Sequence, residues 1–380
     1  GLIVERGLPT GGMPTSTRFH RSPAFPDILP EETHEPAPYG VGDKRYTFSQ
    51  VEMLVAGLAP YQHTDVIAFD PNLLRRGVDH TRSALRALIG THQSPNLDYT
   101  SACHSLERST SAGPYVAGIK SDYWDEDNQC FTGALREHLD KRWDAAMRGQ
   151  ELPNAYKLAL KDELRPIEKN KLGKRRLLWG ADAGLTLCAA AVFKPVADRL
   201  AATIPLCPIA VGINMDSPQI EMMNNAMVGR VVFNLDYSKW DSTMQPALVN
   251  AAVNLLAEWA EPSTLTSVVT HALASPAKGH FEDIIFTTKT GLPSGMPFTS
   301  VLNSLIHMIL FSMAILAAYQ EFGLPYTGNV FENEVMWCYG DDGLYAFTMA
   351  TASLIDTIIS KLKEFGLHPT GADKTENITP

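Results

Sequence analysis

Four aspartates lie in two short segments whose neighbouring residues favour β-strands. Asp236 and Asp241 belong to the run VVFNLDYSKWD, and Asp341 and Asp342 lie between two apolar runs in VMWCYGDDGLYAF. If those strands are neighbours in one sheet, three of the carboxylates meet at one edge. Carboxylate oxygens hold paired Mg²⁺ ions about 3.5–4 Å apart in phosphoryl-transfer sites, and Mn²⁺ accepts the same ligands. The pattern therefore predicts a two-metal site with Asp236, Asp341 and Asp342 as catalytic residues and metal ligands, although an Asp-Asp pair also suits an ordinary turn.

A loop rich in glycine and proline, GLPSG at 291–295, precedes an apolar run that predicts a helix over 299–322. Glycine permits a close approach of the backbone to a ligand. Ser294 and Gly295 could therefore contact a nucleotide or the backbone of a template strand.

Thr299, Asn303 and His307 recur every four positions on this predicted helix and make a polar stripe on an apolar surface. A buried amide needs hydrogen-bond partners. Asn303 therefore either holds a ribose hydroxyl together with Asp241 or satisfies neighbouring backbone groups. We interpret His307 as a histidine of the core.

A basic segment stands out in a chain whose net charge is −10. Residues 157–176 contain eight lysines and arginines against three acidic residues. A protein that binds phosphates needs positive charge only where the phosphates pass, so this segment could bind nucleotides or nucleic acid. A solvated helix or loop would give the same pattern.

Lys374 follows Gly371-Ala372-Asp373 near the end of the sequence. A lysine beside a pyrophosphate leaving group can protonate it as a general acid. A lysine at the protein surface is the alternative interpretation.

The composition is that of a folded chain without a disulfide framework. Of 380 residues, 45% are apolar and 19% are charged, which excludes collagen-like and disordered chains. The five cysteines are never spaced as CxxC, so we expect neither disulfides nor structural zinc. We also expect the protein to work in a reducing compartment. The longest apolar stretch, 305–319, is too short to span a bilayer, so we expect no direct membrane anchor.

The order of the expected elements favours an α+β fold. The proline-rich residues 1–40 suggest an extended arm, and Asp241-Ser242-Thr243 suits a helix N-cap. Helical patterns cover 48–89 (with breaks at Pro60 and Pro71), 132–147, 185–200, 241–260, 299–322 and 352–365. Short strands are expected at 177–179, 231–235, 284–288, 335–339 and 344–347. Because the strands and helices lack a regular βαβ rhythm, we expect an antiparallel sheet flanked by helices.

Five motifs follow one another along the chain: LKDELRPIEKNKLGKRRLLWG, DYSKWDST, GLPSGMPFTSVLNS, YGDD and ADKTE. In this order and spacing they resemble the RNA-dependent RNA polymerases of positive-strand RNA viruses, in particular those of caliciviruses of the vesivirus type. The resemblance extends over about 110–376. It implies an α+β right-hand fold with fingers and palm, in which the thumb is apparently missing from the chain.

The resemblance also implies a division of the chain. An N-terminal arm (1–60) would pack on the fingers, which would comprise 61–183 with the basic loop 157–176, an insertion at 205–230 and a return at 271–293. The palm would comprise a helix at 184–204, the segment 231–270 with Asp236 and Asp241, and the segment 294–380.

The resemblance implies roles for further residues. Asp241, Asn303, Ser294 and Thr299 would bind the nucleotide and its ribose, and Lys161, Lys169 and Arg176 would bind the triphosphate, with Lys171, Lys174 and Arg175 lining the same channel. Thr110, Ser111, Gly113 and Gly295 would contact the template, and Lys374 would be the general acid.

The implied function is RNA-directed RNA synthesis from NTPs with release of pyrophosphate, by two Mg²⁺ ions for which Mn²⁺ can substitute. The implied partners are an RNA template, a primer strand, the viral genome-linked protein as primer and further copies of the chain in a homo-oligomer. The implied location is the host cytoplasm, in viral replication complexes held at membranes by partners. Two alternatives stay open. A reverse transcriptase would share the carboxylates, and a comparison of rNTP with dNTP incorporation distinguishes it from an RNA polymerase. A non-catalytic RNA-binding fragment would share the motifs.

Overall fold

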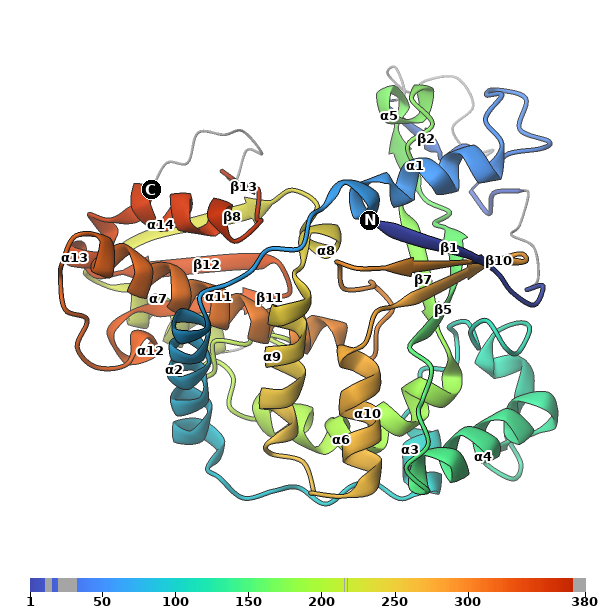
Figure 1. Ribbon diagram of the computed structural model, residues 1–380, viewed down its shortest axis with the longest axis horizontal. Coiled ribbons are helices and arrows are strands. Elements are labelled where there is room, and N and C mark those ends of the chain that lie inside the picture. The colour runs from blue at the N-terminus through green and yellow to red at the C-terminus, as the bar shows by residue number, and fades with distance from the viewer. Residues whose placement is uncertain (11–15, 20–32, 215, 217, 372–380) are drawn as a thin grey trace.

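The computed structural model describes residues 1–10, 16–19, 33–214, 216 and 218–371 (Figure 1). Lys374 and its motif therefore lie outside the described residues.

A four-stranded sheet carries the aspartates singled out in the sequence. Its strands lie in the order β11 (Val335–Tyr339), β12 (Asp342–Phe347), β8 (Val231–Tyr237) and β13 (Pro369–Thr370). Each neighbouring pair is antiparallel. In β8, Phe233 and Leu235 are buried while Val232 and Asn234 are exposed, the alternation expected of a strand with one face on the core. The predicted antiparallel sheet is confirmed.

A five-stranded sheet lies in the other half of the molecule, on the right in Figure 1. Its order is β1 (Leu2–Arg6), β10 (Ile284–Thr288), β9 (Lys278–Phe281), β5 (Ala155–Leu160) and β7 (Leu177–Ala181). β5 and β9 are parallel, and the other pairs are antiparallel. Two short antiparallel pairs join β2 (His34–Pro36) to β6 (Leu164–Pro166) and β3 (Trp124–Asp125) to β4 (Cys130–Phe131). The N-terminal segment, expected to be an extended arm, thus supplies β1 and β2.

Helix α11 (Thr299–Glu321) lies in the core and packs against α2 (Pro71–Ile89), α9 (Pro246–Ala257) and α14 (Ile355–Glu364). Because α11 also contacts β11, it brings α2 to the half that holds the four-stranded sheet. α2 belongs to the segment 61–183, all of which we expected in the fingers.

By length and composition α11 could cross a membrane, so the statement that the apolar stretch is too short was wrong, because the helix extends beyond 305–319 at both ends. However, 89% of its most apolar 18-residue window is buried inside the protein. A helix that is apolar all round and buried is typical of a protein core, so it is weak evidence for a membrane span.

The remaining helices complete the fold. They are α1 (Gln50–His63), α3 (Tyr99–His104), α4 (Gly133–Met147), α5 (Ile167–Lys171), α6 (Ala183–Ala201), α7 (Gln219–Met227), α8 (Trp240–Thr243), α10 (Thr264–Ala274), α12 (Val330–Asn333), α13 (Met349–Ala352) and a 3₁₀ helix at Lys120–Tyr123. In Figure 1, α8 lies between the two sheets. All five cysteines are free.

Three sequence-based boundaries were wrong, and two of them involve proline. Pro60 lies inside α1 instead of ending a helix. The helix expected over 241–260 is split into α8 and α9, because Pro246 starts a new helix at its first position. The expected N-cap at Asp241-Ser242-Thr243 lies inside α8, and the cap is Lys239, with φ 56° and ψ 39°.

Candidate active site

The carboxylates of Asp236, Asp341 and Asp342 lie at one end of the four-stranded sheet. Asp236 lies near the end of β8, Asp342 begins β12, and Asp341 lies in the turn between β11 and β12. β12 pairs directly with β8, with Gly343 opposite Leu235, so the two aspartate-bearing strands are neighbours. Burial raises the pKa of Asp341, and the negative charges of Asp342 and Asp236 raise it further. The three carboxylates therefore lie within electrostatic reach of one another.

Asp241 and Asn303 form a polar pair beside these carboxylates. Burial raises the pKa of Asp241 to about 6, the charge of Asp341 adds to this effect, and a hydrogen bond with Asn303 opposes it. Asn303 Oδ1 accepts a hydrogen bond of 2.8 Å from Trp240 Nε1. Because Oδ1 is engaged by Trp240, the amide nitrogen is left to donate to Asp241. Of the two alternatives for Asn303, the structure thus shows side-chain partners rather than backbone ones.

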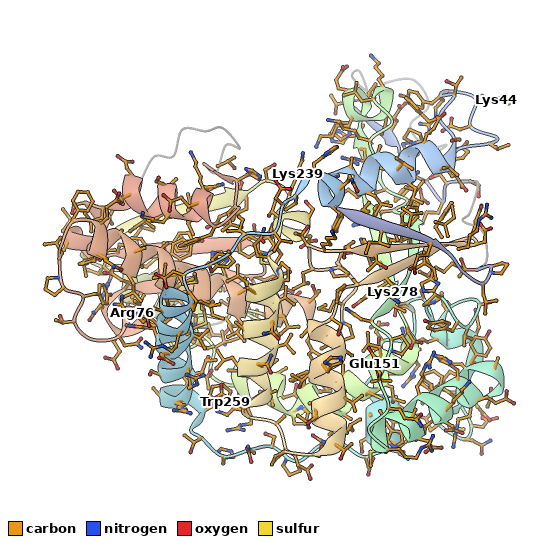
Figure 2. The ribbon with its side chains drawn as sticks, viewed as in Figure 1. Lys44, Arg76, Glu151, Lys239, Trp259 and Lys278 are labelled. Carbon is orange, nitrogen blue, oxygen red and sulfur yellow. The ribbon has the colours of Figure 1, made fainter. Side chains whose placement is uncertain are left out.

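The loop at 290–296 touches both halves of the molecule. Leu292 N donates to the Asp241 carbonyl at 2.8 Å. Ser294 and Gly295 are exposed, and a Cβ added to Gly295 would lie only 1.6 Å from the carbonyl oxygen of Trp179 in β7. Thr299 Oγ1 donates to the Pro293 carbonyl at 3.4 Å, which engages Thr299 within the loop. In the view of Figure 2, Lys239, which precedes α8, lies between the same two halves.

Three cations of the basic segment gather around one carboxylate, Glu163. Arg176 binds it through two nitrogens, with Nε 2.8 Å from Oε1. Lys161 Nζ lies 3.9 Å and Arg165 Nε 3.8 Å from Glu163 oxygens. Glu163 is 8% exposed, whereas Arg176 is on the surface. The side chains of Lys161 and Arg176, expected to bind a triphosphate, are thus paired within the protein.

Arg175 is the residue of this segment that the structure places differently from our expectation of a channel-lining residue. It is 7% exposed and donates to the main-chain carbonyls of Pro38 and Lys161, the latter at 2.6 Å. A guanidinium that holds two carbonyls in the interior supports the chain instead of lining a channel. Lys169 and Lys174 are exposed.

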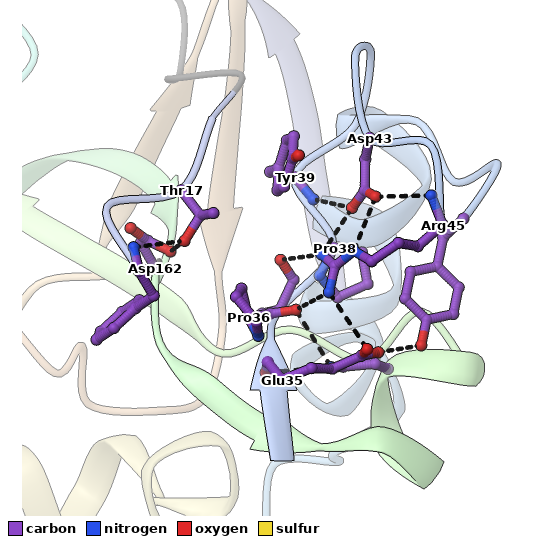
Figure 3. Close-up of polar contacts among 12 residues, drawn as sticks. Thr17, Glu35, Pro36, Pro38, Tyr39, Asp43, Arg45 and Asp162 are labelled. Atoms are coloured by element: carbon purple, nitrogen blue, oxygen red, sulfur yellow. Dashed lines mark hydrogen bonds and ion pairs between the residues drawn. The ribbon is translucent and has the colours of Figure 1, made fainter. Parts of the chain in front are cut away.

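Hydrogen bonds from Thr17 and Arg45 hold the basic segment and the chain beside it in place (Figure 3). Thr17 Oγ1 donates to Asp162 at 2.8 Å. Arg45 donates to both oxygens of Asp43, each at 3.0 Å, and to the Pro36 carbonyl at 2.8 Å. These bonds order the stretch that presents the Pro38 carbonyl to Arg175.

The residues expected at the template entrance form a cluster of their own. Lys120 Nζ donates to Thr110 Oγ1 at 2.6 Å and to the Ser111 carbonyl at 3.0 Å, and Gly113 N donates to Ser111 Oγ at 3.0 Å. Lys120 is 4% exposed, and burial lowers its pKa to about 8. Both hydroxyls are therefore already used to shape this segment.

A family model described as viral RNA-dependent RNA polymerase matches residues 22–380. The chain belongs to the viral RNA-dependent RNA polymerase family. This confirms the resemblance of the motifs, and two curated relatives support the calicivirus kinship.

Both relatives are genome polyproteins of feline calicivirus. The one from the Urbana strain is 38% identical over 377 residues, which are 99% of this chain and 21% of the polyprotein. The one from the Japanese F4 strain is 39% identical over 389 residues, 100% of this chain and 22% of the polyprotein. The polymerase-family chain thus spans about a fifth of the length of these relatives.

A solved structure supports the fold. The Sicinivirus 3Dpol RNA-dependent RNA polymerase matches with a TM-score of 0.79 at 22% identity, over 99% of this chain and 77% of that chain. The expected α+β right-hand polymerase fold is confirmed.

Divalent cations fit the donor set of this viral polymerase chain. Burial raises the pKa of Asp341 and the negative charges of Asp342 and Asp236 raise it further, and a divalent cation would compensate those charges. Within the described part of the chain, no three His, Cys, Asp or Glu side chains are already gathered closely enough to hold a metal ion. The side chains would therefore have to draw together on binding.

Sequence reasoning missed two residues that hold parts of the candidate site in place. Glu163 was treated only as a negative charge within a basic segment, although an acidic residue among cations is itself a pairing signal. Ser304 follows Asn303 and contacts the turn before Asp341, with Gly340 N donating to its Oγ at 2.8 Å. No local pattern predicts that contact, because it depends on how α11 packs against β11.

Proposed function

We propose that this chain catalyses RNA-directed RNA synthesis, joining NTPs to a growing strand and releasing pyrophosphate. The observation that carries the proposal is the meeting of Asp236, Asp341 and Asp342 at the end of two paired strands, beside the Asp241–Asn303 pair. A replicase must accept any sequence, so the template would be bound mainly through its backbone and shape.

The three carboxylates would hold two Mg²⁺ ions, for which Mn²⁺ can substitute because it also prefers oxygen ligands. When bound, the ions would lower the pKa of the attacking 3′-hydroxyl and neutralise charge on the triphosphate. Asp236 and Asp341 would be the principal ligands, with Asp342 beside them. The chain's own contribution is to place Asp236 and Asp342 on two paired strands and Asp341 in the turn that leads into the second of them.

Asp241 would select ribose by accepting a hydrogen bond from the 2′-hydroxyl. With a pKa of about 6, its carboxylate is mostly ionised at neutral pH and is an acceptor. Asn303, fixed by Trp240, orients that carboxylate. A deoxyribose would leave this carboxylate with the hydrogen bond from Asn303 but without the one from the 2′-hydroxyl, which favours a ribonucleotide polymerase over a reverse transcriptase.

Arg176, Lys161 and Lys169 would supply positive charge for the triphosphate. The hydrogen bond to Glu163 would hold the Arg176 guanidinium in place for this role. Ser294, Gly295 and Thr299 would contact the nucleotide or template from the loop, and Lys374 would protonate the pyrophosphate. Thr110, Ser111 and Gly113 would shape the template entrance through Lys120.

We further propose, on the resemblance alone, that the partners are a template, a primer strand or genome-linked protein primer, and further copies of the chain. The expected place is a replication complex in the host cytoplasm, with membrane contact through other proteins.

The test is extension of a labelled RNA primer on an RNA template, with rNTPs or dNTPs and with Mg²⁺, Mn²⁺ or EDTA. Loss of a ligand should reduce incorporation by more than about 100-fold, since loss of a supporting residue alone costs roughly 10–100-fold. Asp341→Asn should therefore be inactive, whereas Asp198→Asn, at an exposed carboxylate on α6, should match the wild type. Equal activity of Asp341→Asn and wild type would overturn the assignment, and preferential use of dNTPs would favour the reverse transcriptase.

A further inference from the structure

Both backbone groups of Gly340 are held by side chains of α11. Gly340 N donates to Ser304 Oγ at 2.8 Å, and the Gly340 carbonyl accepts from His307 Nδ1 at 3.1 Å. Gly340 has φ 62°, in the left-handed region that glycine adopts without strain. The Gly340 carbonyl belongs to the peptide unit that also carries the amide of Asp341. The orientation of this peptide unit therefore sets the position and direction of the Asp341 main chain.

The hydrogen-bond pattern assigns one state to His307. A carbonyl only accepts, so Nδ1 carries the proton, and Nε2 accepts from the Tyr345 hydroxyl. The Tyr237 hydroxyl lies 3.3 Å from that of Tyr345. Burial lowers the pKa of His307 to about 4, so the ring is neutral at physiological pH.

We propose that Ser304 and His307 are positioning residues that hold the Gly340 turn and so place the Asp341 carboxylate for nucleotidyl transfer. The inference rests on the proposed function. A turn centred on glycine has conformational freedom that no side chain of its own can restrict. Two hydrogen bonds from a buried helix fix both of its peptide planes, which pre-organises the carboxylate that follows.

Ser312 shows what a purely structural serine on this helix does. Like Ser304, it is fully buried on α11 and donates back to the carbonyl four residues earlier, at 3.0 Å for Ser312 and 2.7 Å for Ser304. Ser304 differs because its oxygen also accepts from Gly340. Ser304→Ala and Ser312→Ala therefore remove the same local bond, and only the first removes the contact with the turn.

The experiment compares these two variants in single-nucleotide incorporation and in Mn²⁺ binding to the protein without RNA, followed by electron paramagnetic resonance. Ser304→Ala should lower kcat about tenfold and weaken Mn²⁺ binding by a similar factor, because loss of one hydrogen bond and an unpaired donor is worth about that much. KM for the nucleotide should change less than about twofold, since ground-state nucleotide contacts are untouched. Ser312→Ala should match the wild type in all three.

His307 supplies an independent variant should Ser304→Ala fold poorly. His307→Asn keeps an N–H near the position of Nδ1 and should retain Mn²⁺ affinity, whereas His307→Leu should lose it. Equal kcat and equal Mn²⁺ affinity in Ser304→Ala and Ser312→Ala would overturn the proposal, as would full retention in His307→Leu. If the wild type makes no RNA, the proposed function fails, while the Mn²⁺ comparison still decides whether Ser304 places Asp341.

Discussion

The Asp241 carboxylate is hydrogen-bonded to the side-chain amide of Asn303, which pairs the short helix α8 with the long helix α11. Burial and the nearby charge of Asp341 make this carboxylate harder to ionise than in the unfolded chain. Keeping this group ionised at neutral pH costs folding free energy, and that cost can be measured as a pH-dependent change in stability.

Asp241→Asn should stabilise the protein in a pH-dependent way. The folded-state pKa of Asp241 is raised from 3.8 to about 6, so its favourable contribution is complete below pH 3.8 and is lost as pH rises through about 6. An amide does not ionise, so at pH 8 the variant should gain up to about 3 kcal/mol over the wild type. Urea unfolding in EDTA at pH 5 and pH 8 measures this gain. An equal difference at both pH values would contradict the prediction.

Divalent cations should stabilise the folded protein through Asp341. Burial and the charges of Asp342 and Asp236 raise its pKa, so stability falls as pH rises through that pKa and returns when a cation compensates the charge. Mg²⁺ in excess should raise the midpoint of thermal unfolding by about 2–4 °C relative to EDTA. Asp341→Asn should begin from a higher midpoint in EDTA and respond less to Mg²⁺. A full response in that variant would place the cation elsewhere.

Gly295→Ala should damage the fold at the loop. Its Cβ would lie 1.6 Å from the Trp179 carbonyl oxygen, and a main-chain atom cannot move aside as a side chain can. We expect a loss of about 1–3 kcal/mol in the free energy of unfolding, as for overpacked sites. Ser294→Ala, at the exposed neighbouring position, is the matched control and should stay within about 0.5 kcal/mol of the wild type. Comparable stability of the two variants in urea would show that the contact is relaxed in solution.

Glu163→Gln should destabilise the basic segment far more than Glu168→Gln. Burial alone would raise the pKa of Glu163, but hydrogen bonds and charge from Arg176, with the charges of Lys161 and Arg165, lower it. The Glu163 side chain is 11% exposed, whereas that of Glu168, paired with Lys171, is 86% exposed. At pH 7 we expect the free energy of unfolding to fall by about 2–3 kcal/mol in Glu163→Gln and by less than about 0.5 kcal/mol in Glu168→Gln. Because the folded pKa of Glu163 is lowered, its contribution is present above pH 4.5 and should vanish as pH falls through the folded value. An unchanged difference at low pH would argue against the charge cluster.

Much of the fold follows from local patterns in the sequence. Strands are predicted by the apolar run that precedes Asp236 and by the two apolar runs that flank Gly340 and Asp341. The uninterrupted apolar run after the loop at 291–295 predicts α11. The pairing of the two aspartate-bearing strands was a condition of the metal-site hypothesis, and the register of Gly343 with Leu235 meets it.

The errors come from features that local patterns do not encode. Pro60 is tolerated within α1, and Pro246 begins α9 where apolar spacing alone suggested one continuous helix. Arg175 and Arg176 are adjacent and chemically identical, yet Arg175 is buried and holds main-chain carbonyls, whereas Arg176 is exposed and holds the carboxylate of Glu163. Only their tertiary neighbours distinguish them.

The loop at 290–296 is bonded to α8 through Leu292 and lies against β7 through Gly295. If one sheet rotated against the other, this loop would have to leave the Asp241 carbonyl or press into the Trp179 carbonyl. The loop therefore links α8 to β7, so we expect the Asp241–Asn303 pair and the strand that follows the basic segment to move together when the two sheets move.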